Sequence, residues 1–264
     1  MGKSIGVISL KGGVGKTSSV VALGSALADF GKKVLLIDAN FSAPNLGMHL
    51  NILNPEKTLH DVMDRSVNVL DAIYRVGKLD VLPASLFSKK KFSPLKLKDS
   101  LSYLKRKYDY LVIDSSPSLG EETLGAMMAS DGLVVVTTPD VPTLSTTVKA
   151  VKFAKKRNAP ILGLILNKVH GKKFELGLDT IEEMAGVPVM AVIPHDVNFL
   201  KSLSEFVPYT EHSPRSEGAD EFKRLASTIS GEPYKPIKMK RFLRWINPSK
   251  QDVNREVYYK KVFN

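Results

Sequence analysis

Short runs of apolar residues alternate with longer amphipathic stretches along the first 230 residues of the chain. The short runs are nearly continuous in Val, Ile and Leu, which is typical of strands whose two faces are both covered by helices. They predict strands at residues 5–9, 34–38, 79–82, 110–114, 132–137, 161–167 and 187–193. The stretches between them predict helices at residues 16–30, 94–107, 121–129, 142–157, 174–185, 196–205 and 215–230. This alternation predicts an α/β fold, a doubly wound and mostly parallel sheet with helices on both faces.

The alternation ends at Gly231, and a basic segment of different character follows. We interpret residues 1–231 as one domain and residues 232–264 as a basic tail. Pro236 could begin a helix and Pro248 would end it, which predicts a short amphipathic helix at residues 237–247. One side of that helix would carry Met239, Phe242, Leu243 and Ile246, and the opposite side Lys240, Arg241 and Arg244. Such a helix can lie on a bilayer but is too short to cross it. The alternative is that it docks on its own domain or on a protein partner.

The net charge of +11 is concentrated in two places. Residues 232–264 carry nine basic and three acidic side chains, and residues 87–107 carry eight basic and one acidic. The rest of the chain is close to neutral. A neutral body with two basic patches favours local contacts with an anionic surface, either phospholipid or DNA. For residues 87–107 the alternative interpretation is a solvated helix face.

The absence of cysteine excludes disulfides, thiolate zinc sites and iron–sulfur clusters. The five histidines, at positions 49, 60, 170, 195 and 212, have no metal-ligand spacing, and we expect each to be structural. No run approaches the 18 apolar residues of a membrane-spanning helix, and the first residues lack the apolar core of a signal peptide. The missing signal, and not the missing cysteine, predicts a cytoplasmic protein.

A glycine-rich loop follows the first predicted strand and opens the first predicted helix. Residues 9–17 read Ser-Leu-Lys-Gly-Gly-Val-Gly-Lys-Thr. Glycines let backbone N–H groups fold around phosphate oxygens without a Cβ clash, and the helix N-terminus adds its dipole. Lys16 could reach the β- and γ-phosphates, and the Thr17 hydroxyl could ligate Mg²⁺. The residues expected to bind the nucleotide here are Lys11, Gly12, Gly13, Val14, Gly15, Lys16, Thr17 and Ser18.

Polar residues also stand at the ends of other predicted strands, where a parallel sheet presents groups to ligands. Asp114 ends one strand and is expected to contact Mg²⁺ through water, with the capping of a turn as the alternative role. Asn167 ends another; its amide suits the edge of adenine, with Pro194 beside the base, although capping a loop is the alternative role. Asn167-Lys168 also begins like the guanine-reading sequence Asn-Lys-x-Asp. His170 stands where the Asp would be, so a GTPase is not indicated.

The segment Lys-Gly-Gly-Val-Gly-Lys-Thr at residues 11–17 resembles the deviant Walker A loop of the MinD/ParA family of P-loop ATPases. Further similar segments are residues 38–46 (switch I), residues 111–117 (Walker B and switch II), and residues 58–62 and 71–74, which resemble archaeal MinD-like members. The resemblance implies that residues 1–231 form a P-loop ATPase domain with ATP and Mg²⁺ as cofactors. It also implies that Lys11 reaches across an ATP-bound homodimer to the partner's phosphates, where it acts in hydrolysis together with Lys16.

Two further residues receive catalytic roles from the resemblance. Asp38 is implied to position Mg²⁺-bound or attacking water, so the expected metal site is Thr17, Asp38 and Asp114. Asn40 stands where the Asp-x-Asp version of the motif has its second acid. An amide can hydrogen-bond a water molecule but cannot accept its proton. Asn40 is compatible both with slow, activator-dependent hydrolysis and with a nucleotide switch that has little turnover.

The resemblance implies a MinD-type function: an ATP-dependent dimer that cycles on and off the inner face of the cell membrane and positions the division site or polar and motility structures. Residues 237–247 would hold the anionic membrane, and an unidentified activator protein would trigger release. One alternative is a ParA-like partition ATPase that uses the basic patches on nonspecific DNA. Another is a kinase that modifies its own Tyr258 and Tyr259.

Overall fold

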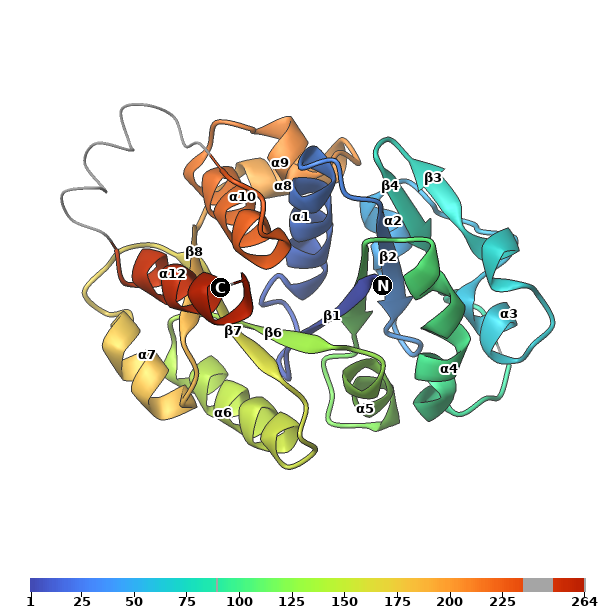
Figure 1. Cartoon of the computed structure of the whole chain (residues 1–264), viewed down its shortest axis with the longest axis horizontal. Helices are drawn as coiled ribbons and strands as arrows, with labels where there is room; N and C mark the ends of the chain where they lie inside the picture. The colour runs from blue at the N-terminus through green and yellow to red at the C-terminus, as the bar shows by residue number, and fades with distance from the viewer. Residues whose placement is uncertain (89, 235–248, 264) are drawn as a thin grey trace.

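The computed structural model describes residues 1–88, 90–234 and 249–263, so the predicted helix at 237–247 lies outside the described residues. The described strands form one sheet in the order β3-β4-β2-β5-β1-β6-β7-β8 (Figure 1). Their bounds are β1 (Lys3–Ile8), β2 (Val34–Ala39), β3 (Tyr74–Val76), β4 (Leu79–Leu82), β5 (Tyr110–Ser115), β6 (Gly132–Thr137), β7 (Ile161–Val169) and β8 (Val189–Pro194). Each neighbouring pair is parallel except the hairpin of β3 and β4. The predicted fold class is confirmed.

Helices cover both faces of the sheet (Figure 1). The α-helices are α1 (Lys16–Asp29), α2 (Leu46–His49), α3 (Leu59–Met63), α4 (Leu97–Leu101), α5 (Glu121–Met128), α6 (Val141–Lys155), α7 (Leu178–Ala185), α8 (Asn198–Ser204), α9 (Tyr209–His212), α10 (Glu217–Ser230) and α12 (Lys250–Phe263). Short 3₁₀ turns are η1 (Val69–Ala72), η2 (Pro94–Lys96) and η3 (Ser102–Arg106). One face is covered by α1, α9 and α10, and the other by α3 to α7.

Strand β2 illustrates how the core follows from the sequence. Val34 and Leu36 pack into the cluster beneath α1 and α10, whereas Leu35 and Ile37 pack into the cluster beneath α3, α4 and α5. Successive side chains of a strand point to opposite faces, so a strand with both faces buried needs apolar residues at every position. The continuous apolar run is explained by this double burial.

Several elements differ from the sequence prediction. The single helix expected at residues 94–107 is divided into η2, α4 and η3. Strand β3 was not predicted, because it has only three residues and pairs through a turn at Gly77, which has φ +55°. The helix expected from residue 174 begins only at Leu178. The short helices α2, α3 and α9 were not predicted either.

The largest unpredicted element is α12, in the part of the basic tail for which no helix was predicted. Its Arg255 is buried, forms an ion pair with Glu221 of α10 at 2.9 Å, and donates to the Met190 carbonyl of β8 at 2.8 Å. Asn254 donates to the Val189 carbonyl at 2.8 Å. These bonds satisfy backbone groups of β8, the edge strand of the sheet. Polar contacts therefore hold the helix, and apolar periodicity could not reveal it.

A long apolar helix is also absent from the described part of the chain: none of its helices could cross a membrane.

Candidate nucleotide-binding site

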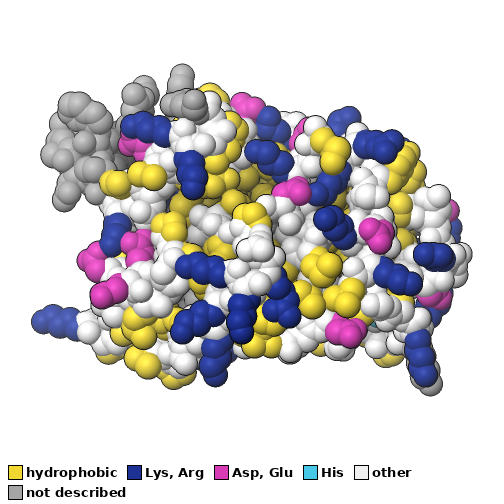
Figure 2. Space-filling model, turned by 60° about the horizontal axis from the view of Figure 1, so that its bottom comes forward, with side chains coloured by type: hydrophobic (Ala, Val, Ile, Leu, Met, Phe, Trp, Pro, Cys, Tyr) yellow, Lys and Arg dark blue, Asp and Glu magenta, His cyan; other side chains and the backbone are white. Residues whose placement is uncertain are grey.

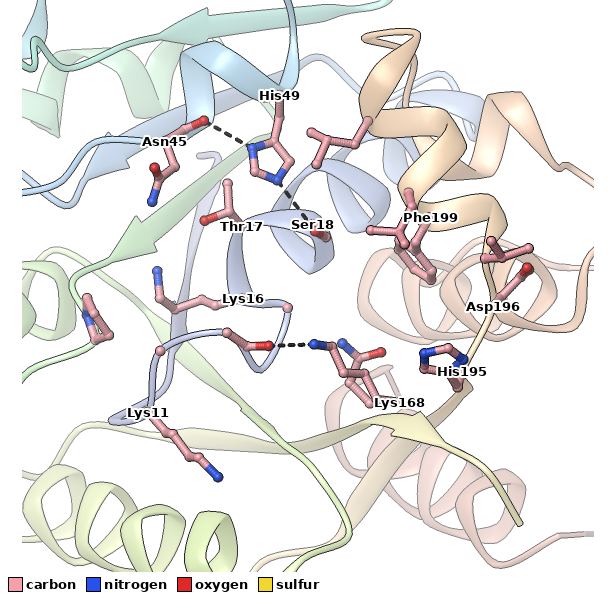
Figure 3. A pocket seen from close by; sticks show the side chains of 18 of the residues that line it. Lys11, Lys16, Thr17, Ser18, Asn45, His49, Lys168, His195, Asp196 and Phe199 are labelled. Atoms are coloured by element: carbon pink, nitrogen blue, oxygen red, sulfur yellow. Dashed lines mark hydrogen bonds between the residues drawn. The ribbon is translucent and has the colours of Figure 1, made fainter. Parts of the chain in front are cut away.

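The glycine-rich loop joins β1 to α1 and forms one wall of a cavity of about 470 Å³ (Figure 3). Gly15 caps α1 with φ 91° and ψ 28°, a left-handed conformation that favours glycine. The cavity lies at the carboxyl ends of the parallel strands, next to β1, where the strand order reverses. The predicted residues that line it are Lys11, Gly12, Gly13, Gly15, Lys16, Thr17, Ser18, Asn40, Asn167 and Pro194. Of the other predicted residues, Val14, Asp38 and Asp114 do not line this cavity.

Asp114 binds two residues at the beginning of α1. The Lys16 ammonium forms an ion pair with its Oδ1, and the Thr17 hydroxyl donates to its Oδ2 at 2.6 Å. Asp114 is fully buried and Lys16 is 8% exposed. Burying an unpaired carboxylate is costly, so the lysine and the hydroxyl stabilise it. The structure thus brings together the cation, the hydroxyl and the carboxylate that the sequence separates by almost 100 residues.

Asp38 lies beside Asp114, its register partner on the neighbouring strand. Its carboxylate accepts backbone N–H bonds from Leu46 at 2.9 Å, Asn45 at 3.0 Å and Asn40 at 3.2 Å. Complete burial, followed by repulsion from Asp114, raises the pKa of Asp38 to about 7. Asp38 lines a separate cavity of about 140 Å³ behind the switch I segment.

Asn40 does line the large cavity. Its amide nitrogen donates to the Ala43 carbonyl at 2.5 Å. Its buried oxygen Oδ1 has no hydrogen-bond partner among the described residues. A buried acceptor without a partner is uncommon in proteins.

Lys11 points away from Lys16, toward the beginning of α6 (Figure 3). Its ammonium donates to Thr143 at 2.7 Å and lies 3.5 Å from Asp140, while its side chain remains 43% exposed. Burial of Asp140 opposes ionisation, but hydrogen bonds from Thr138 and Thr143 lower the pKa of this carboxyl to about 2. Lys11 is therefore held by an ionised carboxylate at the mouth of the site.

The opposite end of the cavity is formed by β8 and α8. Pro194 is followed there by His195 and Asp196. Apolar side chains complete the wall: Val197 just before α8, and Phe199, Leu200 and Leu203 of α8. This apolar end is suited to the flat ring of a base, as expected for Pro194.

Some cavity residues were missed or assigned a structural role. His49 hydrogen-bonds the Asn45 carbonyl at 3.0 Å and lies 3.5 Å from the Ser18 hydroxyl (Figure 3). His195, expected to be structural, also lines the cavity. Only the adjacent Pro194 could have indicated His195, and nothing in the pattern indicated α2, which carries His49. Groups of three or more acidic or histidine side chains able to hold a metal are absent from the described residues.

Comparisons with known proteins agree with this geometry. The family model for an AAA domain matches residues 2–162. An uncharacterized ATP-binding protein of Methanocaldococcus jannaschii is 34% identical over 89% of this chain and 90% of its own length. The sporulation initiation inhibitor protein Soj of Bacillus subtilis is 32% identical over 87% of this chain and 99% of its own.

This chain belongs to the MinD/ParA family. Among solved structures, the septum site-determining protein MinD of Pyrococcus horikoshii, complexed with Mg-ADP, superimposes with a TM-score of 0.82. It is 32% identical, and the match covers 87% of this chain and 96% of that protein. The family membership agrees with the resemblance found in the loop at residues 11–17, and the likeness to archaeal proteins agrees with the one found at residues 58–62 and 71–74.

Proposed function

We propose that this protein is a MinD-type ATPase that dimerises on ATP and cycles on and off a membrane surface to position cellular components. It is an ATPase with ATP and Mg²⁺ as its cofactors, and the cavity beside the glycine-rich loop is the site that receives them. The observation that carries the proposal is the placement of Lys11. This exposed cation stands at the mouth of the cavity, where a second copy of the chain could meet it.

The donor set fits a magnesium ion bound to nucleotide. Mg²⁺ keeps several waters and takes one or two protein oxygens together with phosphate oxygens. Thr17 would supply a direct oxygen and Asp114 an outer one through water, while Asp38 is close by on the next strand. The ion would neutralise charge on the phosphates. Lys16, which now pairs with Asp114, has the flexible stem needed to turn to the phosphates.

The orientation of Asn167 supports adenine as the base. Its amide nitrogen donates to the Val14 carbonyl at 2.7 Å, which leaves its oxygen for a ligand. An acceptor can receive a hydrogen bond from the exocyclic amino group of adenine. The alternative role considered for Asn167, holding a loop, is compatible with this one, since each uses a different atom of the amide.

Hydrolysis would combine the two lysines with Asp38 and Asn40. Water attacks the γ-phosphorus, and the bond to the ADP oxygen breaks, releasing phosphate. Lys16, with Lys11 from the partner, would stabilise charge on the transferred group. Asp38, with its pKa near neutrality, can hold a proton, and the free oxygen of Asn40 can orient a water molecule. This combination supports a slow rate that an activator increases.

The surface that the dimer uses is proposed to be an anionic membrane, contacted by residues 237–247. This segment lies between two anchored parts of the body: Tyr234, whose hydroxyl donates to Asp220 at 2.7 Å, and α12. Each subunit of a dimer would present one such segment, so that two weak contacts act together. The protein would then be cytoplasmic and peripherally attached to the inner face of the membrane.

DNA is the second candidate surface, and the distribution of positive charge on the protein supports it. Lys and Arg side chains gather on the face that carries α4 to α6 (Figure 2). Exposed cations of these helices and of the turns beside them are Lys96, Lys98, Arg106, Lys107, Lys149, Lys152, Lys155, Lys156 and Arg157. A broad cationic face matches a phosphate backbone and predicts salt-sensitive binding.

One experiment with three proteins tests the proposal. Wild type, Lys11→Ala and Lys16→Ala are compared with ATP and with ADP for nucleotide affinity, molar mass in solution, and sedimentation with anionic liposomes or nonspecific DNA. We expect Lys16→Ala to lose ATP binding. Lys11→Ala should bind ATP but remain monomeric, with stimulated hydrolysis lost. Wild-type turnover and dimerisation in Lys11→Ala would refute the role of Lys11 across the dimer. ATP-dependent binding to DNA but not to liposomes would favour the second candidate.

A further inference from the structure

The phosphate loop contains outward-facing carbonyl groups that need hydrogen-bond donors of their own. Gly13 and Gly15 have φ values of +76° and +91°, which are left-handed. When left-handed residues alternate with right-handed ones, successive backbone N–H groups turn toward one concave side. The carbonyl groups then point to the other side. Val14 is buried and Gly15 half-buried, so their carbonyl groups are costly without partners, whereas Gly13 is exposed and a protein donor there takes the place of water. Together these donors hold the shape of the loop.

Three successive carbonyl groups of the loop have such donors. The Gly15 carbonyl accepts from the backbone N–H of Ser19 at 2.9 Å and from its hydroxyl at 2.8 Å. The Val14 carbonyl accepts from the Asn167 amide at 2.7 Å. The Gly13 carbonyl accepts from the Lys168 ammonium, also at 2.7 Å (Figure 3). Two of these donors come from one short stretch of β7.

Neighbouring residues of a regular strand cannot both reach the same loop, because their side chains point to opposite faces. Lys168 departs from regular strand geometry: its φ is +57°, a left-handed value that is strained for lysine. The register of β7 against β8 also shifts between Leu166 and Val169. Irregularities of this kind re-aim side chains next to functional sites. Here the irregularity brings Asn167 and Lys168 to adjacent carbonyls of one loop.

We propose that Lys168 is a positioning residue that fastens the phosphate loop in the nucleotide-free protein, so that its N–H groups are already turned inward when a nucleotide arrives. The left-handed backbone at Lys168 aims this donor at the loop. Pre-ordering the loop lowers the entropy cost of binding, which raises affinity without any direct contact to the ligand. The proposal rests on the nucleotide site proposed above, but its central consequence is measurable in the empty protein.

Hydrogen exchange of the loop amides in nucleotide-free protein is the decisive measurement. Lys168→Met removes the donor and keeps the side-chain length, Lys168→Arg keeps a donor, and Lys173→Met removes a charge from the exposed loop that follows. We expect peptides covering residues 11–18 to exchange faster in Lys168→Met only. Affinity for ATP and for ADP, each with Mg²⁺, should fall about fivefold in Lys168→Met and return toward wild type in Lys168→Arg.

Lys168→Gly separates positioning from stability. Glycine adopts the positive φ without strain, so this variant should melt at or above the wild-type temperature although its loop exchanges faster and binds ADP more weakly. Loss of affinity without faster exchange in the empty protein would mean that Lys168 contacts the nucleotide directly, and would overturn the proposal. Unchanged exchange and affinity in Lys168→Met would overturn it as well. If wild type bound neither nucleotide, the proposed function would fail, whereas the exchange result would still decide the role of Lys168.

Discussion

The Asp38 carboxyl binds its proton more tightly than an ordinary carboxyl does. Burial and the neighbouring Asp114 raise its pKa from 3.8 to about 7. A raised acid pKa means that the folded state holds the proton more tightly, so this contribution to stability is full below pH 4 and is lost as pH rises through 7. Above pH 7 the folded protein must carry a buried negative charge at this position.

Asp38→Asn removes that charge and should therefore stabilise the nucleotide-free protein more at pH 8 than at pH 5. Between these pH values the wild type loses proton-linked stability that the variant does not lose, so we expect the gain to be larger at pH 8 by roughly 2–3 kcal/mol in chelator-containing buffer. Thermal melting of wild type and Asp38→Asn across this pH range measures the difference in their stability. Groups that titrate in both proteins contribute equally to the two curves and cancel in that difference. An equal effect at both pH values would contradict the raised pKa.

Asn40 decides how fast the site can hydrolyse ATP. Its unpartnered oxygen can orient water, but only a carboxylate could also take the proton. Asn40→Asp should therefore increase ATP turnover, by about tenfold if proton acceptance limits the rate. Steady-state phosphate release, measured at saturating ATP with binding verified separately, tests this expectation. Unchanged or lower turnover would mean that Asp38 alone handles the attacking water.

At the scale of elements, the prediction succeeded where burial imposes a pattern. Strand β2 and helix α10 are close to their predicted bounds because each buries apolar residues at the expected period. The sequence also indicated the loop at residues 11–17, Asp114 and Asn167. It could not indicate His49, because α2 has four residues, or the bonds of Asn167 and Lys168 to the loop, because these depend on a local irregularity of β7.

Helix α12 shows the opposite case, since its packing depends on buried polar groups. Arg255 is 5% exposed and pairs with Glu221, which is 1% exposed. Arg255→Met should lower the free energy of unfolding by about 3 kcal/mol, because it removes one partner of a buried ion pair. The matched control is Lys260→Met, whose ion pair with Glu256 is exposed at both ends and should matter by less than about 0.5 kcal/mol. Urea unfolding of both variants measures the two free energies of unfolding. If both variants lost the same amount, a structural role for α12 would be contradicted.

At the scale of the whole molecule, α12 changes how the membrane proposal must be tested. The pattern placed a domain boundary at residue 231, and cutting the chain there would also remove a helix that covers the edge of the sheet. A truncated protein that failed to bind liposomes could have lost either the contact or part of its fold. Substitutions within residues 237–247 leave α12 in place and avoid this ambiguity.

Phe242→Glu combined with Ile246→Glu should abolish ATP-dependent sedimentation with anionic liposomes, because both side chains would lie on the apolar side of the predicted helix and a carboxylate is costly in lipid. Replacing Lys240, Arg241 and Arg244 with Gln should instead weaken binding by about 1 kcal/mol per charge and flatten its dependence on salt. ATP affinity and melting temperature should not change in either variant. If the double glutamate variant still sedimented with liposomes, the contact would lie elsewhere. The cationic face over α4 to α6 would then be the surface to test, and charge reversal at Lys152 and Lys156 would distinguish it from the tail.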